Sequence, residues 1–185
     1  MSNGQPTLRP HAVAVDEMLD KFALQQLVVT YCHGIDRQDL QLVRSLYHDD
    51  AIDDHSPMFY GNADEYVAWL PSILSMWSAT AHIIHNTLFL IDGDQAEGEV
   101  TLTAYHRTAD GTREVIAHGR YIDQYRKRDG VWRFYRRSLT LDWMEERQVA
   151  SQEGPGIAGG VAMGQPSALD PCYQRLPLFA AQRPS

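Results

Sequence analysis

An acidic residue and several histidines occupy positions where they could form a proton-transfer site. Asp36 follows a helix-like segment that Gly34 is expected to end, and His82 and His85 begin an apolar segment with strand character. His106 lies in a later strand-like segment. An aspartate that accepts a hydrogen bond from one imidazole nitrogen orients the ring and leaves the other nitrogen free to take a proton. The pattern therefore predicts general-base chemistry centred on Asp36.

Each of these residues also has a purely structural interpretation. Asp36 could be a turn residue that pairs with Arg37 or with a backbone N–H. His82 and His85 are three residues apart, so in a regular strand they face opposite sides and only one can point toward the helices. His106 shares a strand face with apolar neighbours, and a hydrogen-bonded core histidine explains it as well as a catalytic one does.

The same histidines could be combined with nearby acidic residues into a metal site. The run Asp53-Asp54-His55 would then supply further ligands beside Asp36. We expect this run to be a solvated turn instead. The chain has neither a His-x-x-x-His pair on a helix nor a Cys-x-x-Cys motif, so the sequence predicts no metal site.

Length and composition restrict the class of protein. The 185 residues suit one domain with tails, and 44% hydrophobic residues are enough for a substantial core. The net charge of −8 argues against a nucleic-acid partner or an anionic membrane. No apolar run approaches the roughly 20 residues that would span a bilayer. With two cysteines, Cys32 and Cys172, and no secretion signal, we expect a reduced, cytoplasmic protein.

Hydrophobic periodicity predicts helices first and strands afterwards. Asn62 and Glu65 have the spacing of a capping box at the start of the third helix, and Pro71 should kink or break that helix. The expected helices cover residues 16–34, 39–47 and a segment from 62, with a turn and short strand over 49–54. Four longer strands are expected over residues 82–91, 96–108, 113–126 and 131–143. The order predicts an α+β fold with the helices packed on one face of an antiparallel sheet.

The two ends of the chain differ from the middle in composition. Residues 1–15 contain prolines and no clear period, so we expect a flexible N-terminal arm. Residues 16–147 would form the domain. Residues 148–185 are rich in glycine and proline but keep some apolar residues, so this tail should wrap a surface rather than form its own core.

Three segments resemble the SnoaL-like branch of the NTF2-like superfamily. They are GIDRQDL at 34–40, LYHDDA at 46–51 and YRKRDGVWRF at 125–134, and the resemblance extends over roughly 16–147. It implies a cone-shaped fold in which N-terminal helices pack on a strongly curved, mostly antiparallel sheet.

Within that superfamily the chain is similar to the branch that holds scytalone dehydratase, hexachlorocyclohexane dehydrochlorinase and bile-acid 7α-dehydratase. The resemblance implies that Asp36 and His82 form a catalytic pair without a cofactor, with Tyr31 and His106 as further catalytic groups. The register also favours His82 over His85 as the base. The candidate substrate-binding residues are Arg137, His85, Asp54, Trp69 and Phe89.

The implied function is a cofactor-free lyase acting on a hydrophobic cyclic or aromatic small molecule. Dehydration is the leading reaction, and dehydrohalogenation or loss of formaldehyde would use the same base. Because the fold also serves other functions, a structural protein resembling a β subunit of a ring-hydroxylating dioxygenase and a noncatalytic binding protein are the alternatives. A homodimer or homotrimer is expected.

Overall fold

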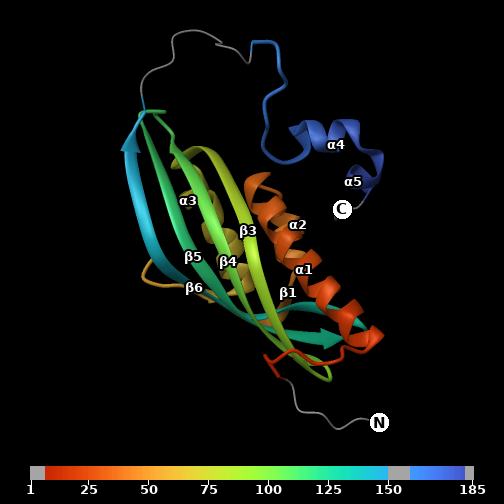
Figure 1. The fold of residues 1–185 in the computed structure, drawn as a ribbon. Coiled ribbons are helices and arrows are strands. Elements are labelled where there is room, and N and C mark those ends of the chain that lie inside the picture. The colour runs from red at the N-terminus through yellow and green to blue at the C-terminus, as the bar shows by residue number, and fades with distance from the viewer. Residues whose placement is uncertain (1–6, 150–158, 182–185) are drawn as a thin grey trace.

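Three helices precede most of a long-stranded sheet in the computed structural model, which describes residues 7–149 and 159–181 (Figure 1). The helices are α1 (Val15–Asp36), α2 (Leu40–Ser45) and α3 (Ala63–Leu74). The strands are β1 (Tyr47–His55), β2 (Phe59–Asn62), β3 (Trp77–Asp92), β4 (Gln95–Thr108), β5 (Arg113–Arg128) and β6 (Val131–Gln148). The α+β fold is therefore as predicted.

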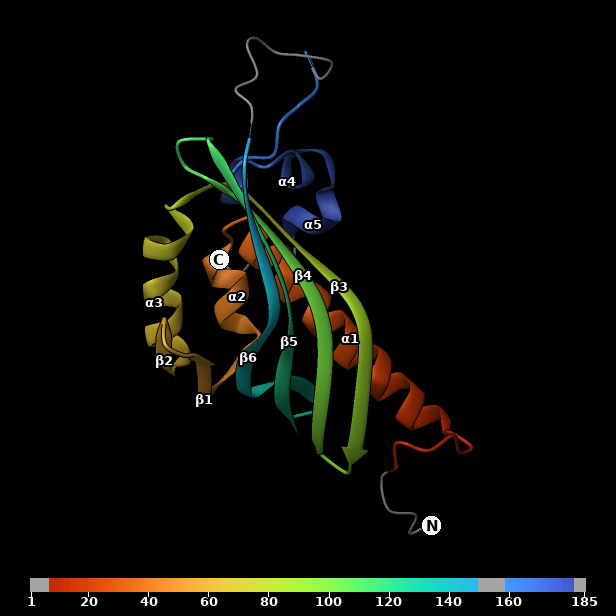
Figure 2. The same cartoon turned by 60° about the vertical axis from the view of Figure 1, so that its left-hand side comes forward.

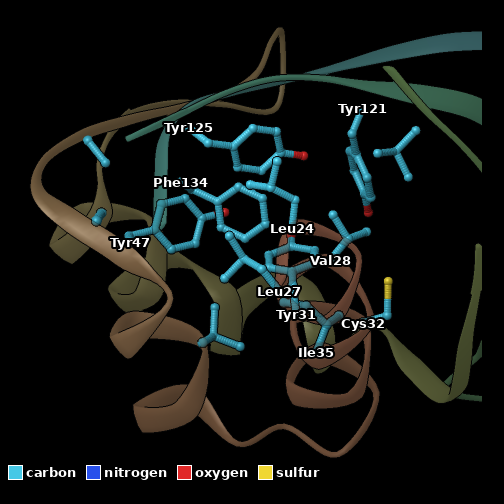
Figure 3. Packing of buried hydrophobic residues seen from close by; sticks show 14 of the residues in the cluster. Leu24, Leu27, Val28, Tyr31, Cys32, Ile35, Tyr47, Tyr121, Tyr125 and Phe134 are labelled. Carbon is cyan, nitrogen blue, oxygen red and sulfur yellow. The ribbon is translucent and has the colours of Figure 1, made fainter. Parts of the chain in front are cut away.

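Helix α1 supplies one side of the core. Leu24, Leu27, Val28 and Tyr31 recur at helical spacing, are buried, and meet aromatic side chains of the sheet (Figure 3). The helix does not end at Gly34 as expected but continues to Asp36. Gly34 instead allows close packing, since a Cβ there would lie 2.8 Å from Cγ2 of Val43 on α2.

The capping box of α3 is confirmed. The Asn62 side chain accepts a hydrogen bond from the Glu65 N–H at 3.0 Å, and the Glu65 carboxylate accepts one from the Asn62 N–H at 2.9 Å. The helix does not break at Pro71 and runs on to Leu74. The N-terminal cap thus defines the start of the helix, whereas Pro71 lies in its last turn and does not stop it.

The six-stranded sheet has the order β2-β1-β6-β5-β4-β3 and is not fully antiparallel. The four long strands pair as an antiparallel meander, as predicted, but β1 pairs in parallel with β6. The expected helix over 39–47 ends at Ser45. The short strand expected within 49–54 is present but longer, because the nine-residue β1 takes in the whole segment and no turn lies there. The sheet is therefore mixed and open.

The sheet bends around α1, α2 and α3, which lie on its concave side (Figure 1 and Figure 2). One cause of the bend is a register shift between His118 and Gly119 where β5 pairs with β6. A Cβ at position 119 would lie 2.3 Å from the Thr140 carbonyl oxygen, so only glycine fits this point. We refer to the concave, helix-covered side as the inner face and to the other side as the outer face.

Part of the expected tail forms short helices beside α1: η2 (Ser167–Leu169), α4 (Pro171–Arg175) and α5 (Pro177–Ala181). The Arg37 guanidinium donates to Asp170 at 3.1 Å, and His33 shares a hydrogen bond with the Tyr173 hydroxyl at 3.0 Å. Of the expected arm, residues 7–14 carry no helix or strand, and residues 1–6 lie outside the described part. Among the helices of the described residues, none is both long and apolar enough to cross a membrane.

The capping box yields a prediction about stability. Asn62→Ala should lower the free energy of unfolding by about 1 kcal/mol, because the Glu65 N–H loses its acceptor. Urea unfolding followed by circular dichroism measures the change. Ser72→Ala, in the exposed last turn of the same helix, is the control and should change stability by less than about 0.5 kcal/mol. Equal effects of the two substitutions would contradict a specific role for the cap.

Candidate functional site

Asp36 and His82 meet at the junction between α1 and β3. The His82 ring Nδ1 lies 2.7 Å from Asp36 Oδ1, and the His82 backbone N–H donates to Asp36 Oδ2 at 2.8 Å. The Thr80 hydroxyl donates to Oδ1 at 3.0 Å. A carboxylate can only accept, so the His82 proton sits on Nδ1 and its Nε2 is left as the acceptor.

The surroundings keep Asp36 ionised. Burial raises the pKa of this carboxyl, but the hydrogen bonds from the His82 ring, the His82 N–H and Thr80 lower it, with a net pKa below the usual aspartate value. The His82 side chain is only 10% exposed, and its Nε2 has no hydrogen bond to any described residue. Asp36 therefore holds the imidazole in one orientation and leaves Nε2 without a partner among the described residues.

His106 lies beside this pair. Its ring is edge-on to the His82 ring at a centroid distance of 5.5 Å and packs against Trp77 at 4.8 Å. Burial, and then the neighbouring His82, lower the pKa of His106 from the ordinary 6.5 to about 4. At neutral pH His106 is therefore an uncharged imidazole that can donate or accept one hydrogen bond.

His85 points away from Asp36. Ile83 and His85 alternate with His82 along β3, and the His85 ring bonds the Thr103 hydroxyl at 2.8 Å. The same hydroxyl bonds His118 on β5, whose ring stacks on Trp143. The structure thus places His85 on the outer face, outside the site around Asp36, where a role in substrate binding has no geometric support.

The inner face beside His82 is apolar and partly open. His82, Ala104, Ala117 and Met144 are aligned across β3 to β6, so their side chains share one face. Met144 is 57% exposed, and Leu141 in the next row is 52% exposed. Small residues next to the imidazole and exposed apolar ones beyond it leave a surface suited to a hydrophobic molecule.

Two hollows in the described part of the chain lie away from the Asp36 and His82 pair. One, of about 550 Å³, is lined by residues of the N-terminal arm, α1 and β3, including Phe22 and Leu88. The other, of about 430 Å³, lies between α1, α2 and the C-terminal helices and is lined by His33 and Tyr173. Neither hollow is lined by His82. The candidate site around Asp36 and His82 is therefore defined by its hydrogen bonds and by the strand register, and not by either hollow.

Tyr31 and Arg137 belong to a different part of the inner face. Tyr31 is buried and shares a 2.5 Å hydrogen bond with the Tyr66 hydroxyl rather than reaching Asp36. Burial raises the pKa of Tyr31 well above that of a free tyrosine. The Arg137 guanidinium lies 4.2 Å from the centre of the Tyr31 ring. These two predicted site residues are therefore brought together, but not with the Asp36 pair.

Arg137 is fully enclosed. Its Nε and Nη2 donate to the two Asp123 oxygens at 2.9 and 2.7 Å, and the guanidinium packs on the Tyr121 and Phe134 rings. Burial opposes the charge, but the Asp123 carboxylate outweighs it and raises the pKa of Arg137. Nη1 alone is left, enclosed and without a partner among the described residues. The structure therefore gives Arg137 no open route to a ligand.

The other predicted binding residues are scattered. Asp54 faces the side of β1 opposite to Asp53, and its carboxylate accepts from the Ser56 N–H at 2.9 Å. Trp69 on α3 stacks on Phe59, and Phe89 is buried against Tyr125. Their contacts are those of packing residues, and none of the three contacts the Asp36 pair.

The run Asp53-Asp54-His55 is not a solvated turn. It lies in β1, where Asp53 and His55 are buried on the inner face. The His55 Nδ1 donates a hydrogen bond to Asp53 Oδ1, and the Tyr47 hydroxyl donates to Oδ2 at 2.7 Å. Their separation by two residues was the available signal, because such residues share a strand face. Within residues 7–149 and 159–181, no three His, Cys, Asp or Glu side chains are grouped to hold a metal ion.

Comparisons with known proteins agree with this architecture. The family model of the SnoaL-like domain matches residues 16–138. Uncharacterised proteins of Mycobacterium tuberculosis and Mycobacterium bovis are 28% identical over 132 residues, covering 69% of this chain and 89% of each relative.

Solved structures with the same fold include two named for elimination reactions. A provisionally assigned scytalone dehydratase of Novosphingobium aromaticivorans superposes with a TM-score of 0.66 at 23% identity, covering 75% of this chain and 95% of that one. A hexachlorocyclohexane dehydrochlorinase superposes with a TM-score of 0.70 at 20% identity, covering 77% of this chain and 99% of that one. At these identities the likeness establishes the fold.

The lowered pKa of His106 predicts how stability depends on pH. Between about pH 6.5 and pH 4 the unfolded chain binds a proton at His106 that the folded chain does not, so stability falls as the pH falls through this window. The loss between pH 7 and pH 4.5 should be roughly 2 kcal/mol from this residue. Urea unfolding of the wild type and of His106→Gln at both pH values measures it. An unchanged pH dependence in the variant would contradict the assignment.

The enclosed position of Arg137 predicts a structural role. Arg137→Met should lower the free energy of unfolding by about 3–5 kcal/mol, because Asp123 would remain buried without its cation. Guanidinium unfolding measures the loss. The double variant with Asp123→Asn should recover part of it, since the uncompensated charge is then removed. A loss below about 1 kcal/mol for Arg137→Met would show that the ion pair is dispensable for folding.

Proposed function

Because the chain belongs to the SnoaL-like domain family and holds an aspartate-oriented imidazole on the inner face of its sheet, we propose that it is a cofactor-free lyase. The observation that carries the proposal is the contact between Asp36 and His82 at 2.7 Å. The structural neighbours named as a scytalone dehydratase and a dehydrochlorinase support the same reaction class. The proposed substrate is a hydrophobic cyclic or aromatic small molecule.

The proposed reaction begins at the free nitrogen of His82. Nε2 takes a proton from a substrate carbon, and the Asp36 carboxylate stabilises the imidazolium that forms. The electron pair of the broken C–H bond forms a C=C bond as the bond to the β leaving group breaks. A leaving hydroxide then takes the proton from His82 and departs as water, which returns the imidazole to its neutral state.

The neighbours of His82 suit this chemistry. His106 is neutral at pH 7 and is near enough to the His82 ring to hydrogen-bond a polar atom of a bound molecule. The apolar row of Ala104, Ala117 and Met144 offers a surface for a ring. Dehydration is the leading case, and dehydrohalogenation is the closest variant, because a halide needs no proton to leave.

The proposal predicts that Asp36→Asn keeps the fold but lowers kcat by about 10²–10⁴, because the asparagine cannot stabilise the imidazolium. His82→Ala should be at least as severe. The assay would follow the rise of enone absorbance with a panel of cyclic β-hydroxy ketones, and the release of chloride with a panel of chlorinated cyclohexanes.

His85→Ala serves as the matched control, since this histidine lies three residues away on the outer face. It should retain kcat within a few-fold. Full activity in Asp36→Asn would eliminate the paired-base mechanism. Tight binding of panel molecules that survives His82→Ala, without turnover by the wild type, would instead identify a noncatalytic binding protein.

A further inference from the structure

The hollow between α1, α2 and the C-terminal helices has the properties of a binding site for a small molecule. Its volume of about 430 Å³ lies within the range of about 300–1,000 Å³ that is usual for ligand pockets. The apolar side chains of Val29, Leu42 and Phe179 line it. None of the described residues that line it is a lysine, arginine, aspartate or glutamate. A molecule that suits this hollow therefore has an apolar body and no charge.

The floor of the hollow is the side of α1 that faces away from the core. Leu24 and Tyr31 are buried against the sheet, and helical spacing places Val29 and His33 on the opposite side. Val29 is 46% exposed, and α1 contains no lysine, arginine, aspartate or glutamate between Phe22 and Ile35. A surface helix ordinarily has charged or polar residues on its outward side. This stretch of α1 is therefore suited to contact with an uncharged molecule.

A network of hydrogen bonds fixes the C-terminal wall of the hollow against α1. Asp170, just before α4, is only 4% exposed and accepts from Arg37 Nη1 at 3.1 Å. The same carboxylate accepts from the Gln165 N–H at 3.0 Å and from the Cys172 N–H at 2.9 Å. This wall lies beyond residues 16–138, the part matched by the SnoaL-like domain family. The hollow is therefore preformed, and one of its walls is an addition to the family's domain.

His33 gives the lining a polar group. Its Nε2 shares a hydrogen bond with the Tyr173 hydroxyl at 3.0 Å, and the Phe179 ring meets the His33 ring edge-on at 5.9 Å. Burial, and then the Arg37 guanidinium, lower the pKa of His33 below its usual value of 6.5, so the ring is neutral at pH 7. The Nδ1 atom of His33 has no hydrogen bond to any described residue.

The chemistry of a neutral imidazole defines the group that would bind His33. Nδ1 is a donor when Nε2 accepts the Tyr173 proton, and an acceptor when Nε2 donates. A hydroxyl group meets either requirement, because it both donates and accepts. A carboxylate would lie in this lining without a cation, and a hydrocarbon would leave Nδ1 without a partner.

We propose that this hollow is a binding site for a small uncharged phenol or cyclic alcohol, with its ring against Val29 and Phe179 and its hydroxyl group bonded to His33. The site is separate from the Asp36 and His82 pair, since neither residue lines the hollow. The proposal therefore does not depend on the lyase function.

The test uses para-cresol as the probe. Toluene lacks its hydroxyl group, and 4-methylbenzoate carries a charge instead. Each molecule is titrated at pH 7 into the ¹⁵N-labelled full chain and followed by NMR. Para-cresol should bind at millimolar or lower concentration and about three- to tenfold more tightly than either matched molecule, as one net hydrogen bond implies. It should shift the amide signals of Val29, Thr30 and His33.

Two tryptophan substitutions on α1 form a matched pair that locates the site. Val29→Trp places a large ring in the hollow and should weaken para-cresol binding at least tenfold. Leu19→Trp changes another exposed residue of the same helix, and Leu19 lines neither hollow. This control should bind para-cresol within two-fold of the wild type.

His33→Phe tests the hydrogen bond itself. This variant should bind para-cresol no more tightly than toluene, whereas its affinity for toluene should stay within two-fold of the wild type. Four results would each overturn the proposal: no binding of para-cresol at millimolar concentrations, equal affinities of the wild type for the three molecules, equal effects of the two tryptophan substitutions, or shifts confined to signals around His82. The wild-type titration decides the question even if a variant does not fold.

Discussion

The Asp36 carboxylate joins the two halves of the fold. It lies at the last residue of α1 and accepts three hydrogen bonds from the start of β3: one from the Thr80 hydroxyl and two from His82. A largely buried carboxylate is stable only with such partners. These hydrogen bonds therefore link the end of α1, the path of the edge strand β3 and the orientation of the His82 ring. The candidate site exists because the Asp36 carboxylate has all three of these hydrogen-bond donors.

A second constraint operates deeper in the molecule. The core contains a cluster of tyrosines around one guanidinium, and Arg137 contacts the rings of Tyr31, Tyr121 and Phe134 while pairing with Asp123. Polar groups buried in this way contribute to a unique arrangement because each requires a defined partner. Asp53 and His55 are held by the same cluster, so this aspartate–histidine pair is as firmly positioned as the core itself.

Side chains on the inner face consequently differ in exposure from one region to another. Around Arg137 the side chains are enclosed and fully packed, whereas beside His82 small residues give way to exposed Met144 and Leu141. This gradient leaves the Nε2 atom of His82 at the boundary between the packed core and an open apolar surface. An imidazole in that position is protected from bulk water yet remains within reach of a hydrophobic molecule.

The sequence by itself determined the helices and long strands, the capping box at Asn62, and the candidacy of Asp36 with His82, because these follow from local periodicity and from the family resemblance. Only the tertiary structure decided that β1 pairs with β6, that Asp53 and His55 are buried, and that Arg137 and Tyr31 lie apart from Asp36. The physical reason is that alternation along a strand shows which residues share a face. Which face the helices cover depends on contacts between segments far apart in the chain.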